Sequence, residues 1–176
     1  MDKSDTANIE QVIEYKIDSI NIINHTEKHF SEYKLKSSDI KKGHCQIGVD
    51  IRIEGDKSCI VIPMKVVMSM DHEGKKYELF STEAVYTYRI KKFKSLFMTN
   101  ESNKYMIPDI FMRTLIGTAL GGMRGIMVAS TSIAEYKKII LPLMETSKIL
   151  DEIKKKNSEL KSNKKTIIRK NHKTFI

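Results

Sequence analysis

The chain has 176 residues, a net charge of +9 and two cysteines. This length is enough for one domain with a hydrophobic core that needs neither disulfides nor metals for stability. No apolar stretch reaches the ~18–20 residues of a transmembrane helix, and the first residues are polar and acidic, unlike a signal peptide. We therefore expect a cytoplasmic protein that does not insert into a membrane.

The positive charge is concentrated near the end of the sequence. Of the 31 lysines and arginines, nine lie between Lys154 and Lys173, where Glu159 is the one acidic residue. Such a composition buries too little apolar surface to offset the entropy of ordering. The sequence thus predicts a single domain over residues 1–153 and a flexible basic tail over residues 154–176.

The first expected strand is Glu14–His25, with a bulge near Asp18 because the apolar phase shifts there. Residues 26–43 then form a connection that is unusually long for one without clear secondary structure. Connections of this kind in compact domains are often functional. We therefore treat residues 26–43 as a candidate functional segment.

Cys45–Ile53 alternates strictly between apolar and polar residues, which is typical of a strand with one buried face. The following Gly55-Asp56 favours a two-residue turn and hence a hairpin. This turn predicts a register in which residue 51 faces 60, 49 faces 62, 47 faces 64 and 45 faces 66.

The next strand is expected over residues 77–90, but the sequence does not decide which of its two faces points into the core. One alternating set is Phe80, Thr82, Ala84, Tyr86 and Tyr88, and the other contains Tyr77, Leu79 and Val85. A polar link over residues 91–105 follows.

A helix over Ile107–Ser130 is the central feature of the sequence. Pro108 and Asp109 are typical of a helix N-terminus, and apolar residues recur at three- and four-residue steps. Gly117, Gly121 and Gly125 recur at four-residue steps, although each glycine costs roughly 1 kcal/mol relative to alanine inside a helix. Either the helix breaks near Gly121, or another backbone packs closely against the glycines.

Close packing of another backbone against these glycines would indicate a subunit interface. From Leu115 to Val128 this helix is apolar almost all round, so it should be buried on more than one side. A two-fold copy of the same helix is the simplest partner. We therefore predict that Gly117, Gly121 and Gly125 mark the interface between subunits.

A short apolar segment over residues 139–143 and a second helix over Met144–Lys155 complete the expected elements. Strands followed by helices predict an α+β fold. The expected architecture is a four-stranded antiparallel sheet with a long crossover after the first strand and two helices packed on the sheet.

No motif in the sequence indicates an enzyme. The glycine spacing departs from the dinucleotide-binding motif at Leu120 and from the P-loop at Met123 and Arg124. The five histidines match no known set of metal ligands, and no serine or cysteine lies in a nucleophile motif. We expect a binding protein with no catalytic residues, metal or cofactor.

The order of these parts resembles the SecB chaperone family. The matching parts are the first strand, the crossover over residues 26–43, three further strands, a proline-led helix that ends in Arg124-Gly125, and Ile140-Leu141-Pro142 before the second helix. The resemblance covers about Glu14–Ile153. It implies the SecB fold, with the long helix at a two-fold interface and two dimers in a tetramer.

The resemblance also implies a function. SecB-like proteins are ATP-independent holdases that bind unfolded polypeptides in apolar grooves, and their clients are exported preproteins or antitoxins of toxin–antitoxin systems. SecB proteins that deliver clients to the SecA motor are typically acidic, whereas this chain is basic and has a lysine-rich tail. A role beside a toxin–antitoxin pair therefore fits at least as well as secretion.

The expected client-binding surface combines the crossover, the sheet and the short apolar segment. Its residues are Phe30, Tyr33, Leu35, Ile40, Phe80, Tyr86, Tyr88, Ile139, Leu141 and Leu143. The alternative function is nonspecific nucleic-acid binding, because a basic tail attracts phosphates. The tail contains Phe175 but no other aromatic residue that could stack on bases.

Overall fold

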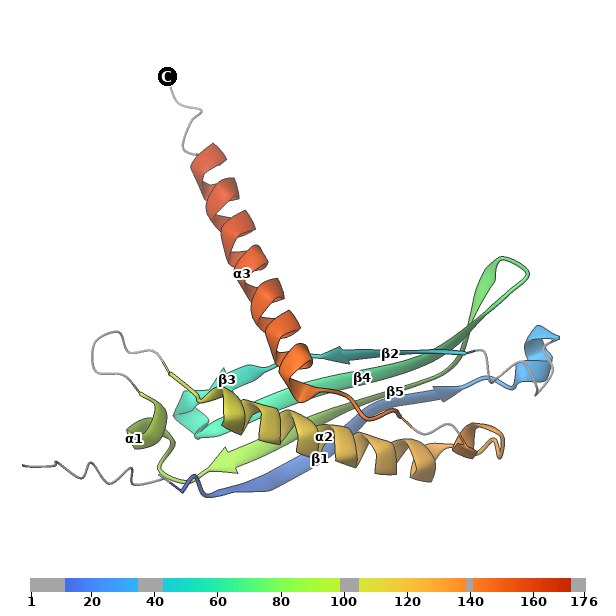
Figure 1. The fold of residues 1–176 in the computed structure, drawn as a ribbon, viewed down its shortest axis with the longest axis horizontal. Coiled ribbons are helices and arrows are strands. Elements are labelled where there is room, and N and C mark those ends of the chain that lie inside the picture. The colour runs from blue at the N-terminus through green and yellow to red at the C-terminus, as the bar shows by residue number, and fades with distance from the viewer. Residues whose placement is uncertain (1–11, 35–42, 99–104, 139–140, 172–176) are drawn as a thin grey trace, which may run out of the picture.

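The computed structural model describes residues 12–34, 43–98, 105–138 and 141–171. The fold is α+β, with one antiparallel sheet that carries helix α2 on one face (Figure 1). The strands are β1 (Tyr15–Glu27), β2 (His44–Val49), β3 (Arg52–Glu54), β4 (Cys59–His72) and β5 (Lys75–Ile90). The helices are α1 (Phe93–Phe97), α2 (Asp109–Ser130) and α3 (Thr146–Asn171).

The strand order across the sheet is β1-β5-β4-β2, and β3 also pairs with β4. β1 and β2 are consecutive in the chain but lie at opposite edges of the sheet. The chain between them must therefore cross the whole width of the sheet. This requirement explains why the sequence has such a long connection after its first strand.

The sheet has five strands where four were expected, because the strand over Cys45–Ile53 is interrupted after Val49. The backbone N–H of Asp50 donates to the carbonyl of Pro63 at 3.0 Å. Proline has no N–H with which to return a hydrogen bond. The ladder therefore breaks opposite Pro63 and resumes at Arg52.

The predicted hairpin is present, but its predicted register is wrong by two residues. The observed pairs are Ile53 with Ile60, Val49 with Met64, Ile47 with Val66 and Cys45 with Met68. The connection is longer than the expected two-residue turn, because Gly55–Lys57 forms a 3₁₀ turn and Ser58 adopts a left-handed conformation with φ 56°. A shift of two residues keeps every side chain on its predicted face.

The predicted bulge in β1 is confirmed, since the register with β5 shifts between Ile17 and Ser19. A second bulge lies between Ile22 and Asn24. The open question about β5 is settled in favour of its even-numbered residues, which are buried from Phe80 to Tyr88. Leu79 is buried as well, because the register between β4 and β5 shifts after Met68.

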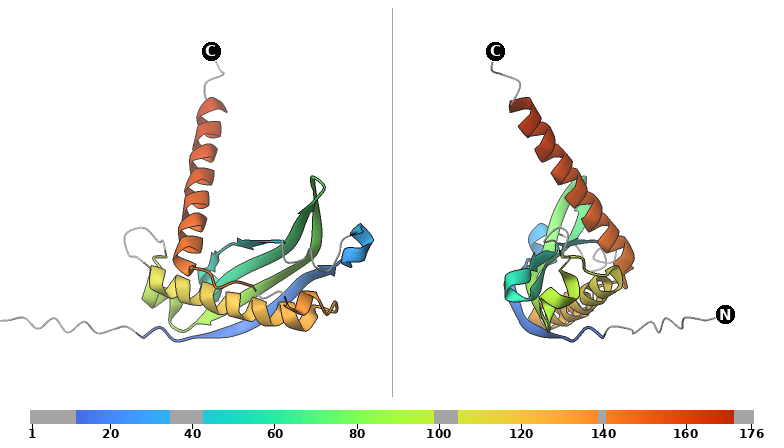
Figure 2. Two further views of the ribbon diagram at one scale, coloured as in Figure 1. Left: turned by 45° about the vertical axis from the view of Figure 1, so that its right-hand side comes forward. Right: turned by 90° about the vertical axis from the view of Figure 1, so that its left-hand side faces the viewer.

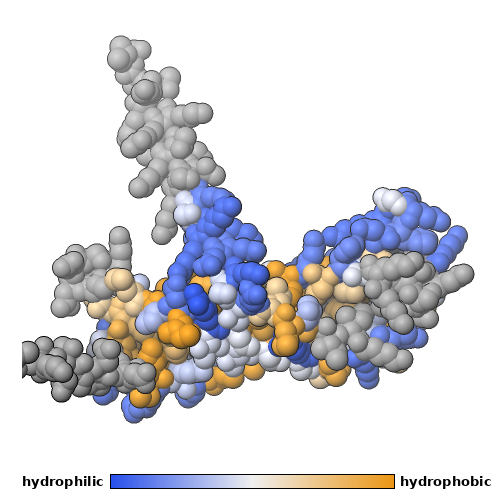
Figure 3. Space-filling model, viewed as in Figure 1, coloured by the Kyte–Doolittle hydropathy of each residue, from blue (hydrophilic) through white to orange (hydrophobic). Residues whose placement is uncertain are grey.

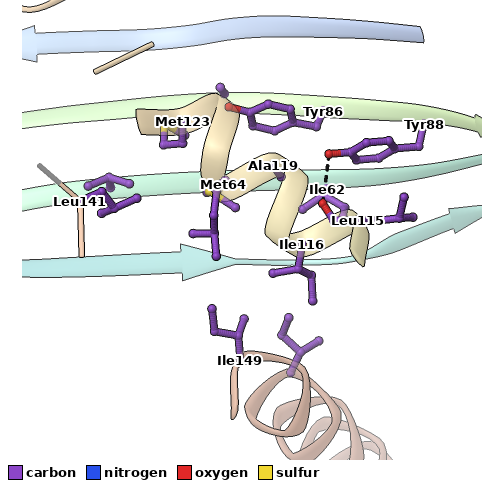
Figure 4. Packing of buried hydrophobic residues seen from close by; sticks show 14 of the residues in the cluster. Ile62, Met64, Tyr86, Tyr88, Leu115, Ile116, Ala119, Met123, Leu141 and Ile149 are labelled. Atoms are coloured by element: carbon purple, nitrogen blue, oxygen red, sulfur yellow. Dashed lines mark hydrogen bonds between the residues drawn. The ribbon is translucent and has the colours of Figure 1, made fainter. Parts of the chain in front are cut away.

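Helix α2 runs unbroken through its glycines and packs on β4 and β5 (Figure 4). The Tyr88 hydroxyl donates to the Leu115 carbonyl at 3.1 Å. The ring of Tyr86 lies so close to Gly122 that a Cβ there would be 2.8 Å from ring atom Cε1. Gly122 is therefore the glycine of α2 whose missing side chain allows close packing within the chain.

The buried face of α2 meets a continuous core. Its buried residues are Phe111, Met112, Leu115, Ile116, Ala119, Leu120, Met123 and Met127. Ile149, Leu150 and Ile153 of α3 belong to the same core, and Figure 4 shows Ile149 beside the α2 packing. These contacts combine the sheet, α2 and the first turns of α3 into one hydrophobic unit.

Helix α3 continues to Asn171, so the expected helix end near Lys155 is wrong. Lysine and glutamate are good helix formers and the sequence contains no proline here, so nothing local ends the helix. α3 leaves the sheet and points away from it in all the ribbon views (Figures 1 and 2). The expected polar link over residues 91–105 also contains the short helix α1, which buries Phe93 and Phe97.

The packing around Gly55 yields a test of the fold. A Cβ on Gly55 would lie about 2.0 Å from the ring of Tyr105, so Gly55→Ala must displace that ring. Overpacking of this kind costs typically 1–3 kcal/mol. We expect Gly55→Ala to lower the free energy of unfolding by about that amount in urea denaturation.

Gly48→Ala is the matched control for this test, because a Cβ on Gly48 would meet only the Lys65 carbonyl at 3.9 Å. It should leave the free energy of unfolding unchanged or slightly higher. Equal stability of the two variants would show that Tyr105 does not occupy this position.

Candidate functional site

One edge of the sheet presents apolar side chains on the same face as α2. In β1, Ile17, Ile20 and Ile22 lie opposite Tyr88, Tyr86 and Ala84 of β5, and these partners are buried under α2. The three isoleucines themselves are 43–52% exposed. α2 covers the neighbouring strands and leaves the β1 isoleucines open to solvent.

The outer side of α2 continues this apolar surface. Ile110 and Val128 are exposed there, and Thr114, Gly121 and Gly125 fall on the same side of the helix between them. Figure 3 shows pale and orange surface, of neutral and apolar residues, over this part of the molecule. The hydroxyl of Thr114 donates to the Ile110 carbonyl at 2.9 Å, one turn back along the helix. This bond satisfies the hydroxyl within the helix, so the outer side of α2 needs no polar partner at Thr114.

We call the combination of Ile17, Ile20, Ile22, Ile110, Thr114, Gly121, Gly125 and Val128 the edge surface. Around Gly121 and Gly125, no atom of the described residues would lie within 4 Å of an added Cβ. A Cβ on Gly117 would make an ordinary contact of 3.6 Å with Thr146. Close packing inside the chain therefore does not explain Gly121 and Gly125, and their role at a subunit interface stays a prediction.

The backbone of β1 adds a second property to the edge surface. β1 pairs with β5 along one side, and among the described residues no strand pairs with its other side. A long, apolar and unpaired edge strand is a template for pairing with another chain. The edge surface therefore combines backbone hydrogen-bonding groups with apolar side chains.

A separate groove lies at the opposite edge of the sheet, between β2 and the first turns of α3. Its volume is about 370 Å³. The apolar residues that line it are Ile47, Val49, Leu143, Met144, Ile149 and Ile153, and we call it the β2 groove. Two acids and two lysines complete its rim, namely Glu145, Lys148, Glu152 and Lys156.

The apolar floor of the β2 groove is partly open to solvent. Leu143 is 92% exposed and Met144 is 38% exposed, whereas Ile149 and Ile153 are buried. β2 is an edge strand, so its outer backbone groups are not paired within the described sheet. Here, too, apolar side chains lie beside a free strand edge.

Arg124 of α2 holds one wall of the β2 groove in place. Its guanidinium donates from Nε to the Leu141 carbonyl at 3.0 Å and from a terminal nitrogen to the Pro142 carbonyl at 2.8 Å. Leu141 is buried, so the segment that leads to Leu143 is fixed from both sides. This explains why a single arginine lies in the apolar stretch of α2.

Hydrogen bonds also fix the segment after the C-terminal end of α2 to β1. The carboxylate of Glu27 accepts hydrogen bonds from the backbone N–H of Ser132 at 3.0 Å and from its hydroxyl at 2.5 Å. Burial raises the pKa of Glu27, but the bonds from Ser132 and the nearby His25 outweigh burial, and the pKa lies below its usual value. Tyr136, which is buried, adds a bond from its hydroxyl to the Lys28 carbonyl at 2.7 Å.

A larger recess than the β2 groove lies elsewhere, at the end of β1 and β5. Its volume is about 780 Å³ and it is lined mainly by charged residues. Lys91 pairs with Glu14 at 2.8 Å, and Arg89 pairs with Asp18 at 2.8 Å. Because these cations are already neutralised and exposed, the recess offers a ligand little unpaired charge.

The ten predicted client-binding residues fall into three groups. Leu143 is exposed in the β2 groove, while Phe30 and Tyr33 lie in a 3₁₀ turn after β1 and are half-buried. Leu35, Ile40 and Ile139 lie outside the described residues. The remaining four are buried in the core, namely Phe80, Tyr86, Tyr88 and Leu141.

The expected exposure of Phe80, Tyr86 and Tyr88 is wrong, because α2 covers this face of the sheet. Tyr86 is 1% exposed, and burial raises its pKa to about 12. Whether any of the ten residues contacts a client stays a prediction. Six residues of the edge surface and the β2 groove were not among the predicted binding residues, namely Ile17, Ile20, Ile22, Ile47, Val49 and Met144. For β1 the sequence did contain a signal, because this strand has more apolar residues than a strand with one covered face needs.

Comparisons with known proteins give limited information. No family model matches the chain, and no curated protein matches it. A search of solved structures finds the Mycobacterium tuberculosis Rv1957 SecB-like chaperone in complex with a ChAD peptide from the Rv1956 HigA1 antitoxin. The identity is 9%, the TM-score is 0.47, and the match covers 74% of this chain and 91% of that one.

A second match is a protein of unknown function from Streptococcus agalactiae, with 9% identity and a TM-score of 0.29. It covers 77% of this chain and all of that one. At these values neither match carries an argument about what this chain does. Within the described residues, no helix has the length and apolar composition needed to cross a bilayer.

The anchoring role of Arg124 is testable. Arg124→Met removes two hydrogen bonds from a charged group, and such bonds contribute about 1.5–3 kcal/mol each. We expect a lower free energy of unfolding and faster amide hydrogen exchange in residues 143–150, because the wall of the β2 groove loses its attachment.

Arg113→Met on the same helix is the control. The Nε of Arg113 is buried without a hydrogen-bond partner among the described residues, so its replacement should change little. If Arg124→Met leaves exchange in residues 143–150 as slow as in the wild type, Arg124 does not hold this segment.

Proposed function

We propose that this chain is a SecB-like holdase that binds unfolded polypeptides on apolar surface, without ATP and without catalysing a reaction. The observation that carries this proposal is the β2 groove, where apolar side chains lie beside a free strand edge. An extended polypeptide can pair with such an edge while its alternate side chains enter the groove. Main-chain bonds supply affinity for any sequence, and the groove favours apolar segments.

The arrangement of the elements supports a SecB-like fold within this proposal. The sheet order β1-β5-β4-β2 requires a crossover between the two edges. The two long helices α2 and α3 follow the strands, with an anchored apolar segment between them. This is the layout that the resemblance in the sequence implies.

Antitoxins are the client class that we favour over exported preproteins. The uncovered face of the sheet carries Lys16, Lys65 and Arg89 beside Asp18 and Glu83, so it is not an acidic surface. SecB proteins that deliver preproteins to SecA are typically acidic. This chain is basic and therefore lacks the acidic character that would favour SecA as its partner.

We also propose that the edge surface joins two copies of the chain, as a step towards a dimer of dimers. Two β1 strands related by a two-fold axis can pair in antiparallel fashion along their unpaired edges. The same axis brings the exposed isoleucines and the small residues of α2 into contact. Gly121 and Gly125 leave room for this approach because no side chain projects from them.

The client site is tested by Leu143→Ser. Burying a leucine side chain contributes roughly 1.5–3 kcal/mol, so the variant should bind a reduced, carboxymethylated and permanently unfolded protein at least about tenfold more weakly. Binding is measured by fluorescence anisotropy of the labelled client. Because Leu143 is 92% exposed, the fold should not change.

Val12→Ser is the matched control, since Val12 is 81% exposed and lies away from the β2 groove. It should bind the client as tightly as the wild type does. Equal weakening by both variants would mean that exposed apolar area in general, and not the β2 groove, holds the client. No binding of unfolded protein by the wild type would end the holdase proposal.

The subunit interface is tested by Ile20→Lys, which places a charge in the centre of the edge surface. We expect the variant to form smaller species than the wild type at micromolar concentration in multi-angle light scattering. Ile53→Lys is the control, because Ile53 on β3 is 44% exposed and Ile20 is 43% exposed.

Gly121→Leu provides an independent variant for the same interface, because a Cβ there would have no atom of the described residues outside its own helix turn within 4 Å. It should dissociate the assembly as Ile20→Lys does. A monomeric wild type, or variants that assemble like the wild type, would contradict the interface.

A further inference from the structure

The far part of α3 is a charged rod that leaves the body of the protein. Ile149, Leu150 and Ile153 fix the start of α3 in the core. From Lys154 to Glu159 every side chain is exposed, and the helix continues to Asn171. We call residues 154–171 distal α3, and Figures 1 and 2 show it pointing away from the sheet.

Nearly all the net charge of the protein lies on this rod and the residues just after it. Nine of the 31 basic residues and one of the 22 acidic residues lie between positions 154 and 173, which leaves a charge of only +1 on the rest. The rise of an α-helix is about 1.5 Å per residue, so distal α3 is roughly 25 Å long. The charge is therefore spread along an extended, regular element.

The positions of the charges follow the helix. Positions 161, 165 and 169, which are Lys161, Lys165 and Arg169, recur at four-residue steps and so share one side of α3. Lys154, at the start of distal α3, is already paired with the Asp109 carboxylate at 2.6 Å and is not part of this row. A row of cations at helical spacing matches a row of phosphates better than it matches a single small anion.

We propose that distal α3 binds the phosphate backbone of double-stranded nucleic acid without reading its sequence, as a function separate from client holding. Among the eighteen residues of distal α3 the large apolar ones are Leu160, Ile167 and Ile168, too few for the apolar face of a membrane-surface helix. The segment contains no aromatic residue, so it lacks the platforms that bind single strands by stacking.

The test measures binding of the full chain to a labelled DNA duplex of about 20 base pairs by fluorescence anisotropy. The variant Lys161→Gln/Lys165→Gln/Arg169→Gln removes three charges from one side of distal α3. Each phosphate contact contributes about 0.9 to the slope of log Kd against log salt, so this slope should fall by up to about 2.7. At about 50 mM salt the dissociation constant should rise at least tenfold.

The control Lys65→Gln/Lys75→Gln/Lys94→Gln removes three exposed charges from the sheet and α1, and its slope should equal that of the wild type. Lys161→Arg/Lys165→Arg keeps the charge and should keep the affinity. Equal weakening by the control, or loss of affinity in the charge-retaining variant, would overturn the proposal. So would tighter binding to phosphatidylserine vesicles or to single-stranded DNA than to the duplex.

Discussion

The packing of α2 on the sheet is the contact on which the other features of this protein depend. An α-helix with its side chains is about 10–12 Å wide, whereas neighbouring strands are about 4.8 Å apart. One helix can therefore cover only about two strands. α2 lies over β4 and β5, where Gly122 admits the ring of Tyr86 and the Leu115 carbonyl accepts the Tyr88 hydroxyl.

A sheet of this width under one helix has two uncovered margins, and they differ. At the β2 margin, the first turns of α3 and the segment held by Arg124 narrow the open space to a groove. At the β1 margin no described element takes that place, and isoleucines lie open beside an unpaired strand edge. The first geometry suits an extended polypeptide, whereas the second suits a flat and symmetric partner.

Periodicity made the burial pattern of the sheet predictable, but it could not specify the register. Alternation in Cys45–Ile53 correctly placed Ile47, Val49 and Ile51 against the core, but Cys45 and Ile53 at its ends are exposed. The loop from Gly55 to Ser58 moved the pairing by two positions. The left-handed Ser58 and the close contact of Gly55 with Tyr105 are long-range or conformational features that no local pattern encodes. In the same way, alternation placed Phe80, Tyr86 and Tyr88 on one face without indicating that a helix lies over them.

The sequence by itself determined the α+β class, the bulge near Asp18, the long crossover and the uncharged glycine side of α2, because these depend on side-chain periods and local backbone preferences. Only the tertiary structure decided which glycine packs inside the chain and which ones face solvent. Gly122 contacts the ring of Tyr86, whereas Gly121, one residue earlier, lies about 100° away around the helix axis, on the outer side of α2. The position of α2 on the sheet makes this distinction, and that position depends on contacts between residues far apart in the chain.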